Sequence, residues 1–241
     1  MAQGDEGQGF QRLHEREAVS IVVTGIVTDV VNLIANPVAS DDTPEEPWYW
    51  KREPSHWYAK QADFALSSLG RGPGKCLVIG SPLFEAKELA QAGWDVTYVD
   101  VRKPPSTEGF KFIQGDAATL DFGAGFDCAS STCVLCHAGL GRYGDPMIER
   151  GDEAILKNVL RSLKVGGLFA VTFGPVFTVD VTERNSRVHR VYSLAEARKM
   201  TTGFRIVEEK ILDTRVNDWV PGLNTDKILD INYLSMLLEK V

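Results

Sequence analysis

The chain has 241 residues, 44% of them hydrophobic and 24% charged, with a formal net charge of -7 and a pI near 5.2. This size and composition fit a globular protein with one α/β domain and an appendage. The acidity disfavours a general nucleic-acid binder, because affinity for nucleic acid depends mainly on Lys and Arg side chains that neutralise phosphates. Four clustered cysteines do not match the framework of a secreted, disulfide-rich protein.

The first residues favour a cytoplasmic protein. Residues 1–9 are polar and acidic and lack the basic stretch and apolar run of a signal peptide. The most apolar early segment, residues 18–35, contains Asp29 and Asn32 and is slightly short for a membrane span. We therefore expect neither a membrane segment nor a membrane partner.

The same early segment predicts a helix. Between residues 17 and 35, apolar side chains recur at helical spacing, so we expect an amphipathic helix that packs on its own domain. A homodimer contact through this helix is the main alternative. Residues 37–54 are rich in proline and acid and predict a connecting loop. Together they indicate an N-terminal extension over residues 1–54, followed by one domain over residues 55–241.

In that domain, apolar strands alternate with amphipathic helices. The pattern predicts helices at about 55–69, 82–92 and 152–163, and strands at 75–79, 94–99, 110–114, 126–132, 168–173, 204–212 and 231–239. Ser193, with Glu196 three residues later, is typical of a capping box that opens another helix. Apolar strands separated by helices indicate a doubly wound, mostly parallel, Rossmann-like α/β sheet covered on both faces.

In such sheets, ligands bind at the carboxyl ends of the strands, which draws attention to Gly80-Ser81-Pro82 after the first strand. Gly80 permits a tight turn and a close approach of the backbone to a ligand. Ser81 is the expected N-cap of the next helix, and Pro82 its first residue. A dinucleotide site needs two more glycines here, and Pro82 has no N–H to donate to a pyrophosphate, so an NAD(P)-dependent oxidoreductase is disfavoured.

Two acids follow the next two strands. Asp100 ends the second strand, where it can accept hydrogen bonds from both hydroxyls of a ribose, and Asp116 follows the third, where it can accept from an adenine amine. Each alone is equally explained as a turn-forming Asp. Together, without a phosphate loop, they indicate a site for a nucleoside that carries no pyrophosphate.

Several segments together resemble class I S-adenosylmethionine-dependent methyltransferases over roughly residues 55–241. They are KCLVIGSP, TYVDVR, FIQGDA, FDCASSTCVLCH and LRSLKVGGLFAVTFG. The resemblance implies a seven-stranded sheet that ends in an antiparallel hairpin, and S-adenosylmethionine as cofactor. More narrowly, GLGRYGDP (residues 139–146) and RVHRVYS resemble a little-characterised bacterial and archaeal subgroup of methyltransferase-like proteins of unknown function.

The resemblance also implies where the cofactor lies. Its methionine part would run along Gly80 and Ser81, its ribose at Asp100 and Val101, its adenine at Asp116 and Ala117, and its sulfonium before Ser131, Thr132 and Cys133. This chain departs from the family in its first motif, which lacks the second and third glycines. A domain that binds the cofactor or serves as a scaffold without catalysing is therefore the first alternative.

Residues that follow the fourth strand are the candidates for contact with the methyl acceptor. His137 lies where an acceptor would enter and could take its proton, although a residue that shapes the loop or orients the substrate is the alternative. Tyr143 and Arg142 lie on the glycine-rich loop that follows. Arg142 could hold a carboxylate or phosphate, or instead pair with the acids at 152–153.

His189 and Arg190 are expected to form the far wall of the acceptor pocket, although surface polarity explains them almost as well. Cys128, Cys133 and Cys136 have the spacing of a plant-type iron–sulfur site, but no fourth cysteine follows them, so we predict no metal.

The sequence thus predicts a methyltransferase that acts on an oxygen or nitrogen atom of a small molecule, with no nucleic acid as partner. The alternatives are the catalytically silent cofactor-binding or scaffold protein, a tRNA methyltransferase and an NAD(P)-dependent oxidoreductase.

Overall fold

The computed structural model describes residues 52, 54, 56–177, 189–214, 216–221 and 232–241. The predicted helix at 17–35, and with it the dimer contact, lies outside these residues. Within the described part of the chain, every helix is too short or too polar to cross a membrane.

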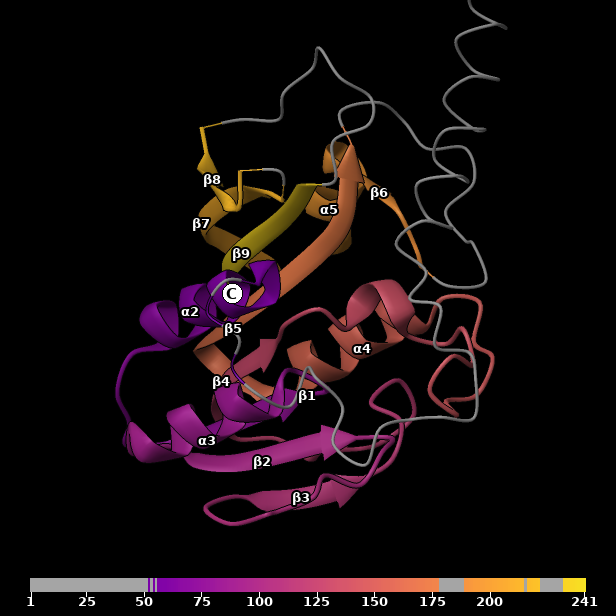
Figure 1. The fold of residues 1–241 in the computed structure, drawn as a ribbon. Helices are drawn as coiled ribbons and strands as arrows, with labels where there is room; N and C mark the ends of the chain where they lie inside the picture. The colour runs from indigo at the N-terminus through magenta and orange to yellow at the C-terminus, as the bar shows by residue number, and fades with distance from the viewer. Residues whose placement is uncertain (1–51, 53, 55, 178–188, 215, 222–231) are drawn as a thin grey trace, which may run out of the picture.

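The described residues form one mixed sheet with helices on both faces (Figure 1). The helices are α2 (Trp57–Leu69), α3 (Leu83–Gln91), the 3₁₀ turn η2 (Leu135–His137), α4 (Gly151–Ser162) and α5 (Leu194–Met200). The strands are β1 (Lys75–Ile79), β2 (Asp95–Asp100), β3 (Lys111–Gln114), β4 (Phe126–Ser131), β5 (Leu163–Phe177), β6 (Tyr192–Ser193), β7 (Phe204–Asp213), β8 (Asp218–Val220) and β9 (Asn232–Lys240).

The strand order is β3-β2-β1-β4-β5-β9-β7-β8, with β6 paired to β5. Strands β1 to β5 are parallel, whereas β9 runs antiparallel to both of its neighbours, β5 and β7. The prediction of a mostly parallel α/β sheet is confirmed, but the described residues form nine strands rather than seven. The two additional strands, β6 and β8, have two and three residues, too few for a pattern of alternating side chains to reveal them.

The alternation of side chains along β1 divides the core into two halves. Cys76 and Val78 face α2 and α3, whereas Leu77 and Ile79 face α4 and α5. Figure 1 shows α2 and α3 on the near face of the sheet, with α4 and α5 behind it. Because both faces are covered, the strands in the centre of the sheet are apolar on both sides.

Two predicted helix starts have different outcomes. Ser193 caps α5, because its Oγ accepts a hydrogen bond from the Glu196 N–H at 3.1 Å. The prediction that Ser81 caps the helix after β1 is wrong: α3 begins one residue later, and Pro82 is its N-cap. The reason is that Ser81 Oγ is used elsewhere, since it accepts from the Thr132 N–H at 2.8 Å and donates to the Ile79 carbonyl at 3.3 Å.

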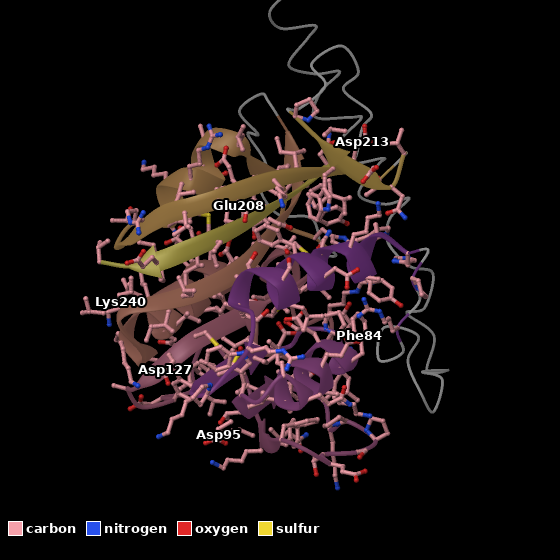
Figure 2. The ribbon with its side chains drawn as sticks, turned by 90° about the vertical axis from the view of Figure 1, so that its left-hand side faces the viewer. Phe84, Asp95, Asp127, Glu208, Asp213 and Lys240 are labelled. Carbon is pink, nitrogen blue, oxygen red and sulfur yellow. The ribbon has the colours of Figure 1, made fainter. Side chains whose placement is uncertain are left out.

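The two edges of the parallel strands differ in chemistry. At the amino ends, Asp95 and Asp127 pair with Lys111 and Lys164 on the surface. Figure 2 shows both acids on the far side of the molecule from Phe84, which lies in the first turn of α3. The predicted cofactor residues therefore belong to the edge on the Phe84 side.

Candidate functional site

Backbone hydrogen bonds bring the ends of neighbouring strands together at one edge of the sheet. The Gly80 N–H donates to the Val99 carbonyl at 2.7 Å, and the Gly115 N–H donates to the Asp100 carbonyl at 3.0 Å. Gly80 has a φ of 53°, a backbone conformation that favours glycine, and a β-carbon there would lie 3.1 Å from Val134 Cγ2. The predicted turn at Gly80 is thus present, next to the end of β2.

Asp100 is buried, 5% exposed, and its carboxylate is fully engaged. Oδ1 accepts from the Arg102 N–H at 2.8 Å and from Arg102 Nε at 3.1 Å, while Oδ2 lies 3.2 Å from Arg102 Nη2 and 3.1 Å from the Tyr98 hydroxyl. The Arg102 guanidinium also stacks over the ring of Tyr143, 4.3 Å from its centroid. A ribose would have to compete with Arg102 for this carboxylate.

Asp116 has an oxygen that is not used within the protein. Its Oδ1 accepts from the Ala118 N–H at 2.9 Å, but the buried Oδ2 has no hydrogen-bond partner among the residues that the structure describes. Burial is the main cause that raises the pKa of Asp116, and the nearby Asp145 carboxylate adds to it. A buried acceptor oxygen without a partner is costly unless a ligand supplies the donor.

The turn after Asp116 is held by a residue that the sequence analysis missed. Asn158 Nδ2, on α4, lies 2.8 Å from the Ala117 carbonyl and 3.1 Å from the Ala118 carbonyl. Ala117 itself is buried, and Val101 opposite is half-buried, with its carbonyl bonded to Gln114 Nε2 at 3.2 Å. The Asn158 side chain therefore fixes the backbone of the predicted adenine subsite.

A buried polar cluster joins β1, β4 and α3 beneath the edge. Glu85 is fully buried and its Oε1 accepts a hydrogen bond from the Ser130 hydroxyl. Burial raises the pKa of Glu85 to about 7, although hydrogen bonds to its carboxylate act in the opposite direction. Ser131 and Thr132, which follow Ser130, are also buried, and Ser131 Oγ has no hydrogen-bond partner within the described residues.

Cys133, the predicted neighbour of the sulfonium, has an unusual backbone. Its φ is 61°, a left-handed conformation that a residue with a side chain seldom adopts. Its thiol donates to Gln61 Oε1, on α2, at 2.9 Å, and burial holds the pKa of that thiol well above its usual range. Strain of this kind concentrates at functional sites, and here it turns the chain sharply at the end of β4.

The GLGRYGDP loop lies over both parts of the site. Asp145 fixes its shape, since Oδ1 accepts from the Tyr143 N–H at 3.1 Å and Oδ2 from the Gly141 N–H at 3.2 Å. Tyr143 then contacts Arg102 on the predicted cofactor side, whereas Arg142 Nη1 lies 3.4 Å from His137 Nδ1 on the predicted acceptor side. Tyr143 also packs edge-on against His137, with ring centroids 5.4 Å apart, so it lies between the predicted cofactor residues and the predicted acceptor residues.

The alternative partner for Arg142, an acid at the start of α4, is not found there. Asp152 pairs with Arg190, and Glu153 pairs with Arg150. Arg142 is therefore placed toward the site rather than toward α4.

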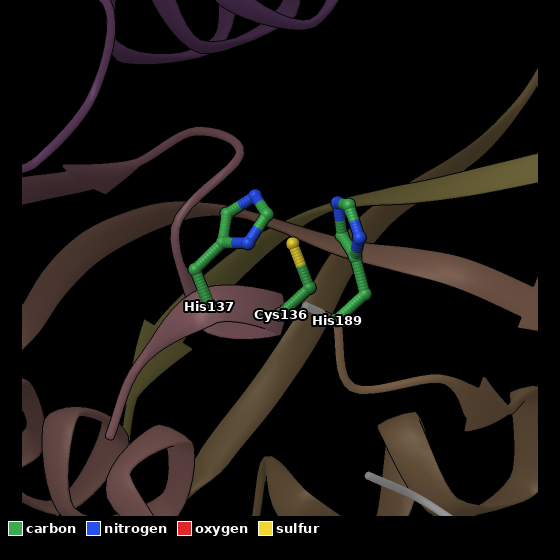
Figure 3. A group of neighbouring side chains, drawn as sticks. All are labelled: Cys136, His137 and His189. Atoms are coloured by element: carbon green, nitrogen blue, oxygen red, sulfur yellow. The ribbon is translucent and has the colours of Figure 1, made fainter. Parts of the chain in front are cut away.

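His137 and His189 are brought together from distant parts of the sequence. Their ring centroids are 4.3 Å apart, and Cys136 lies between them (Figure 3). Burial, with a smaller effect of the Arg142 charge, lowers the pKa of His189 to about 4. Burial likewise raises the pKa of the Cys136 thiol to about 12. In the absence of a ligand, both side chains are therefore neutral at physiological pH.

Arg190 is held away from this group. It is 1% exposed, its Nε lies 3.4 Å from Asp152 Oδ1, and its Nη2 donates to the Ile148 carbonyl at 2.9 Å. The hydroxyl of Tyr192 donates to the other Asp152 oxygen at 3.1 Å. This arrangement anchors the segment that carries His189 on the start of α4.

Aromatic side chains from two other elements lie near Cys133 and Cys136, beside the predicted acceptor residues. Trp57, at the start of α2, stacks on Tyr233 of β9, with ring centroids 4.5 Å apart and planes at 12°. Burial, together with the neighbouring Cys136 and Cys133, holds the pKa of Tyr233 well above its usual range. Sequence reasoning missed Tyr233 and Arg102, although Arg102 is part of the TYVDVR segment.

The order and the directions of the strands define the fold. A parallel β3-β2-β1-β4-β5 order, extended by an antiparallel β9 between β5 and β7, is the sheet of the class I S-adenosylmethionine-dependent methyltransferase fold. The predicted resemblance to that fold is confirmed.

Comparisons with known proteins agree. The chain is similar to the 1,6-didemethyltoxoflavin-N1-methyltransferase of Burkholderia thailandensis, crystallised with bound 1,6-didemethyltoxoflavin and S-adenosylhomocysteine. The identity is 17%, 94% of this chain and 90% of that chain are covered, and the TM-score is 0.58. It is also similar to the N-methyltransferase NodS of Bradyrhizobium japonicum, crystallised with S-adenosylhomocysteine. The identity is 17%, 82% of this chain and 93% of that chain are covered, and the TM-score is 0.55. The [4+2]-cyclase SpnF matches at 17% identity, with 89% of this chain and 93% of that chain covered and a TM-score of 0.56.

A family described as a Caenorhabditis protein of unknown function, DUF268, matches residues 105–216. These residues include GLGRYGDP and RVHRVYS, which agrees with the predicted likeness to a poorly characterised group. No curated protein matches the sequence.

Proposed function

We propose that this protein is an S-adenosylmethionine-dependent methyltransferase that methylates an oxygen or nitrogen atom of a small molecule. The observation that supports it best is the unused Oδ2 of Asp116, one strand along from Asp100, at the edge where Gly80 turns the chain. An adenine amine is a donor of the kind that this oxygen lacks. The neighbours crystallised with S-adenosylhomocysteine have the same fold.

The residues present fit such a cofactor. Asp116 would accept from the adenine amine, and Asp100 from the ribose hydroxyls once Arg102 releases it. Gly80 would let the backbone approach the methionine part, and the unused hydroxyl of Ser131 is available near the end of β4. Pro82 supplies no N–H, which suits a cofactor without a pyrophosphate.

S-adenosylmethionine supplies a methyl group on a sulfonium, which an acceptor lone pair attacks while the electrons of the broken S–CH₃ bond stay on sulfur. The protein has to hold the acceptor in line with that bond. Trp57 and Tyr233 offer a flat apolar wall, and Arg142 a positive charge for an acidic group on the acceptor. His137 is the residue that would take the acceptor's proton.

Calorimetric titration with S-adenosylmethionine and S-adenosylhomocysteine tests the proposal. We expect both to bind, and Asp116→Asn to weaken binding about tenfold or more, because the side-chain amide presents a donor to the adenine amine while the turn is kept. Asp127→Asn, at the opposite edge of the sheet, is the matched control and is expected to leave affinity unchanged. If Asp116→Asn binds S-adenosylmethionine and S-adenosylhomocysteine as tightly as the wild type does, the predicted adenine subsite is contradicted.

The second candidate is a catalytically silent cofactor-binding or scaffold protein. It is favoured by one observation, the complete engagement of Asp100 by Arg102. Absence of binding of both ligands would favour a scaffold, whereas binding without methyl transfer to any of a panel of hydroxyl and amine acceptors would favour a silent binding protein. Titration with NAD(P) and with tRNA tests the two remaining alternatives, of which tRNA methylation predicts strongly salt-dependent binding.

A further inference from the structure

Cys136, His137 and His189 form a compact group of metal-ligand side chains beside the proposed site (Figure 3). One ligand atom from each residue lies within 4.8 Å of the other two. Cys136 and His189 are 3% and 5% exposed, so the group is largely shielded from water. Thiolate sulfur and imidazole nitrogen are the ligands that zinc prefers in proteins.

The fold holds the two segments of this group together without a ligand. The Arg190 N–H donates to the Cys136 carbonyl at 2.6 Å, which fixes the backbone next to His189 against η2. The buried pair of Arg190 and Asp152 anchors the same segment on α4. The backbone segments that carry the three ligand side chains are therefore held side by side before any metal binds.

We propose that Cys136, His137 and His189 bind one zinc ion, whose fourth position takes a hydroxyl oxygen of the acceptor. The first part is independent of the cofactor, whereas the second rests on the proposed methyltransferase function. Three protein ligands and one open position are the pattern of catalytic rather than structural zinc sites.

The distances are compatible with this assignment. Zn–N and Zn–S bonds of about 2.0–2.3 Å place tetrahedral ligands roughly 3.3–3.8 Å apart, so the present group has to contract by about 1 Å. The guanidinium of Arg142, 3.4 Å from His137 Nδ1, has to turn away, and the glycines on either side of it in the loop allow this. The Cys136 thiol loses its proton to solvent when the metal binds.

A bound zinc ion would change the role of His137 from base to ligand. The metal lowers the pKa of a coordinated hydroxyl, so the acceptor gives its proton to solvent before transfer. Its oxygen lone pair then forms the new O–CH₃ bond as the S–CH₃ bond breaks and leaves its electron pair on sulfur. The site would thereby favour an alcohol or phenol over an amine.

The test uses the full chain and needs no cofactor. After chelation and dialysis, the protein is titrated with Zn²⁺, its metal content is measured by mass spectrometry, and Co²⁺ is used as a spectroscopic substitute. We expect one zinc per chain and, with Co²⁺, the charge-transfer band of a cobalt–thiolate bond. Uptake of no zinc, or a cobalt spectrum without that band, overturns the site even if S-adenosylmethionine binds.

Variants assign the ligands. Cys136→Ala and His189→Ala are expected to weaken zinc binding by on the order of 100-fold or more, whereas Cys128→Ala and His56→Ala keep it. Unchanged affinity in both ligand variants overturns the assignment. If these two variants fail to fold, the zinc titration and the cobalt spectrum of the wild-type protein still decide whether the metal site exists. Catechol is the probe for the open fourth position of the metal. A shift of the cobalt bands when catechol is added supports binding of an acceptor hydroxyl there, and an unchanged spectrum overturns that part of the proposal.

Discussion

The buried carboxyl of Glu85 should make the stability of this protein fall as the pH rises. In the folded protein its pKa is about 7, against 4.5 for the ordinary side chain. Between these two values, the folded state keeps a proton that the unfolded state has released. The free energy of unfolding therefore falls with rising pH across this window, and the loss is complete above pH 7.

The size of the effect follows from the two pKa values. Each pH unit between them is worth about 1.4 kcal/mol, so the total cost of ionising Glu85 in the folded state is roughly 3 kcal/mol. No discount for solvent applies, because the side chain is 0% exposed. Glu85→Gln, which cannot ionise, should escape this cost, and its stability relative to the wild type should rise by roughly 2–3 kcal/mol between pH 5 and pH 8.

Urea denaturation of both proteins at pH 5, 6, 7 and 8 measures this difference. Glu88→Gln is the matched control, since it removes a charge from the same helix at a side chain that is about a third exposed. We expect the difference in free energy of unfolding between Glu88→Gln and the wild type to change much less with pH. A difference between Glu85→Gln and the wild type that stays constant from pH 5 to pH 8 would refute the reasoning.

Three further variants probe the site. Arg102→Ala should raise the affinity for S-adenosylmethionine severalfold in calorimetry, because it frees Asp100, and a loss of affinity would instead make Arg102 a cofactor ligand. Cys133→Gly should be more stable to urea than Cys133→Ala by about 1 kcal/mol, because only glycine adopts a φ of 61° without strain; equal stability contradicts this. Arg190→Ala should cost about 3–5 kcal/mol of stability, because it breaks the buried ion pair with Asp152. Normal stability with impaired acceptor binding would instead support the predicted role of Arg190 in the acceptor pocket.

Much of the fold could be predicted because its signals are local. The strand at 75–79 was predicted with its observed bounds, since an apolar run lies between glycines, and α4 is displaced by only one residue. β5 was predicted too short, at 168–173 instead of Leu163–Phe177. The glycines at 166–167 suggested a break, and the register with β4 does shift there, but Leu163 pairs with Phe126 before the glycines, and pairing with β9 carries the strand beyond residue 173.

The spatial arrangement of the candidate site residues was predictable only where it depends on strand order. Asp100 and Asp116 follow neighbouring strands, so their shared edge follows from the parallel pattern. The contact of Arg102 with Asp100 depends on a rotamer and on the Tyr143 ring, which no spacing reveals. The approach of His189 to Cys136 depends on a backbone hydrogen bond between segments far apart in the chain.

The place of β9 has a consequence for how this protein is made. Residues 232–240 form an interior strand, so β5 and β7 cannot be joined until that segment has left the ribosome. Until then the nascent chain presents two long unpaired strand edges, which are templates for association with other chains. A translation stop shortly before residue 232 should therefore yield inclusion bodies rather than a folded, truncated protein.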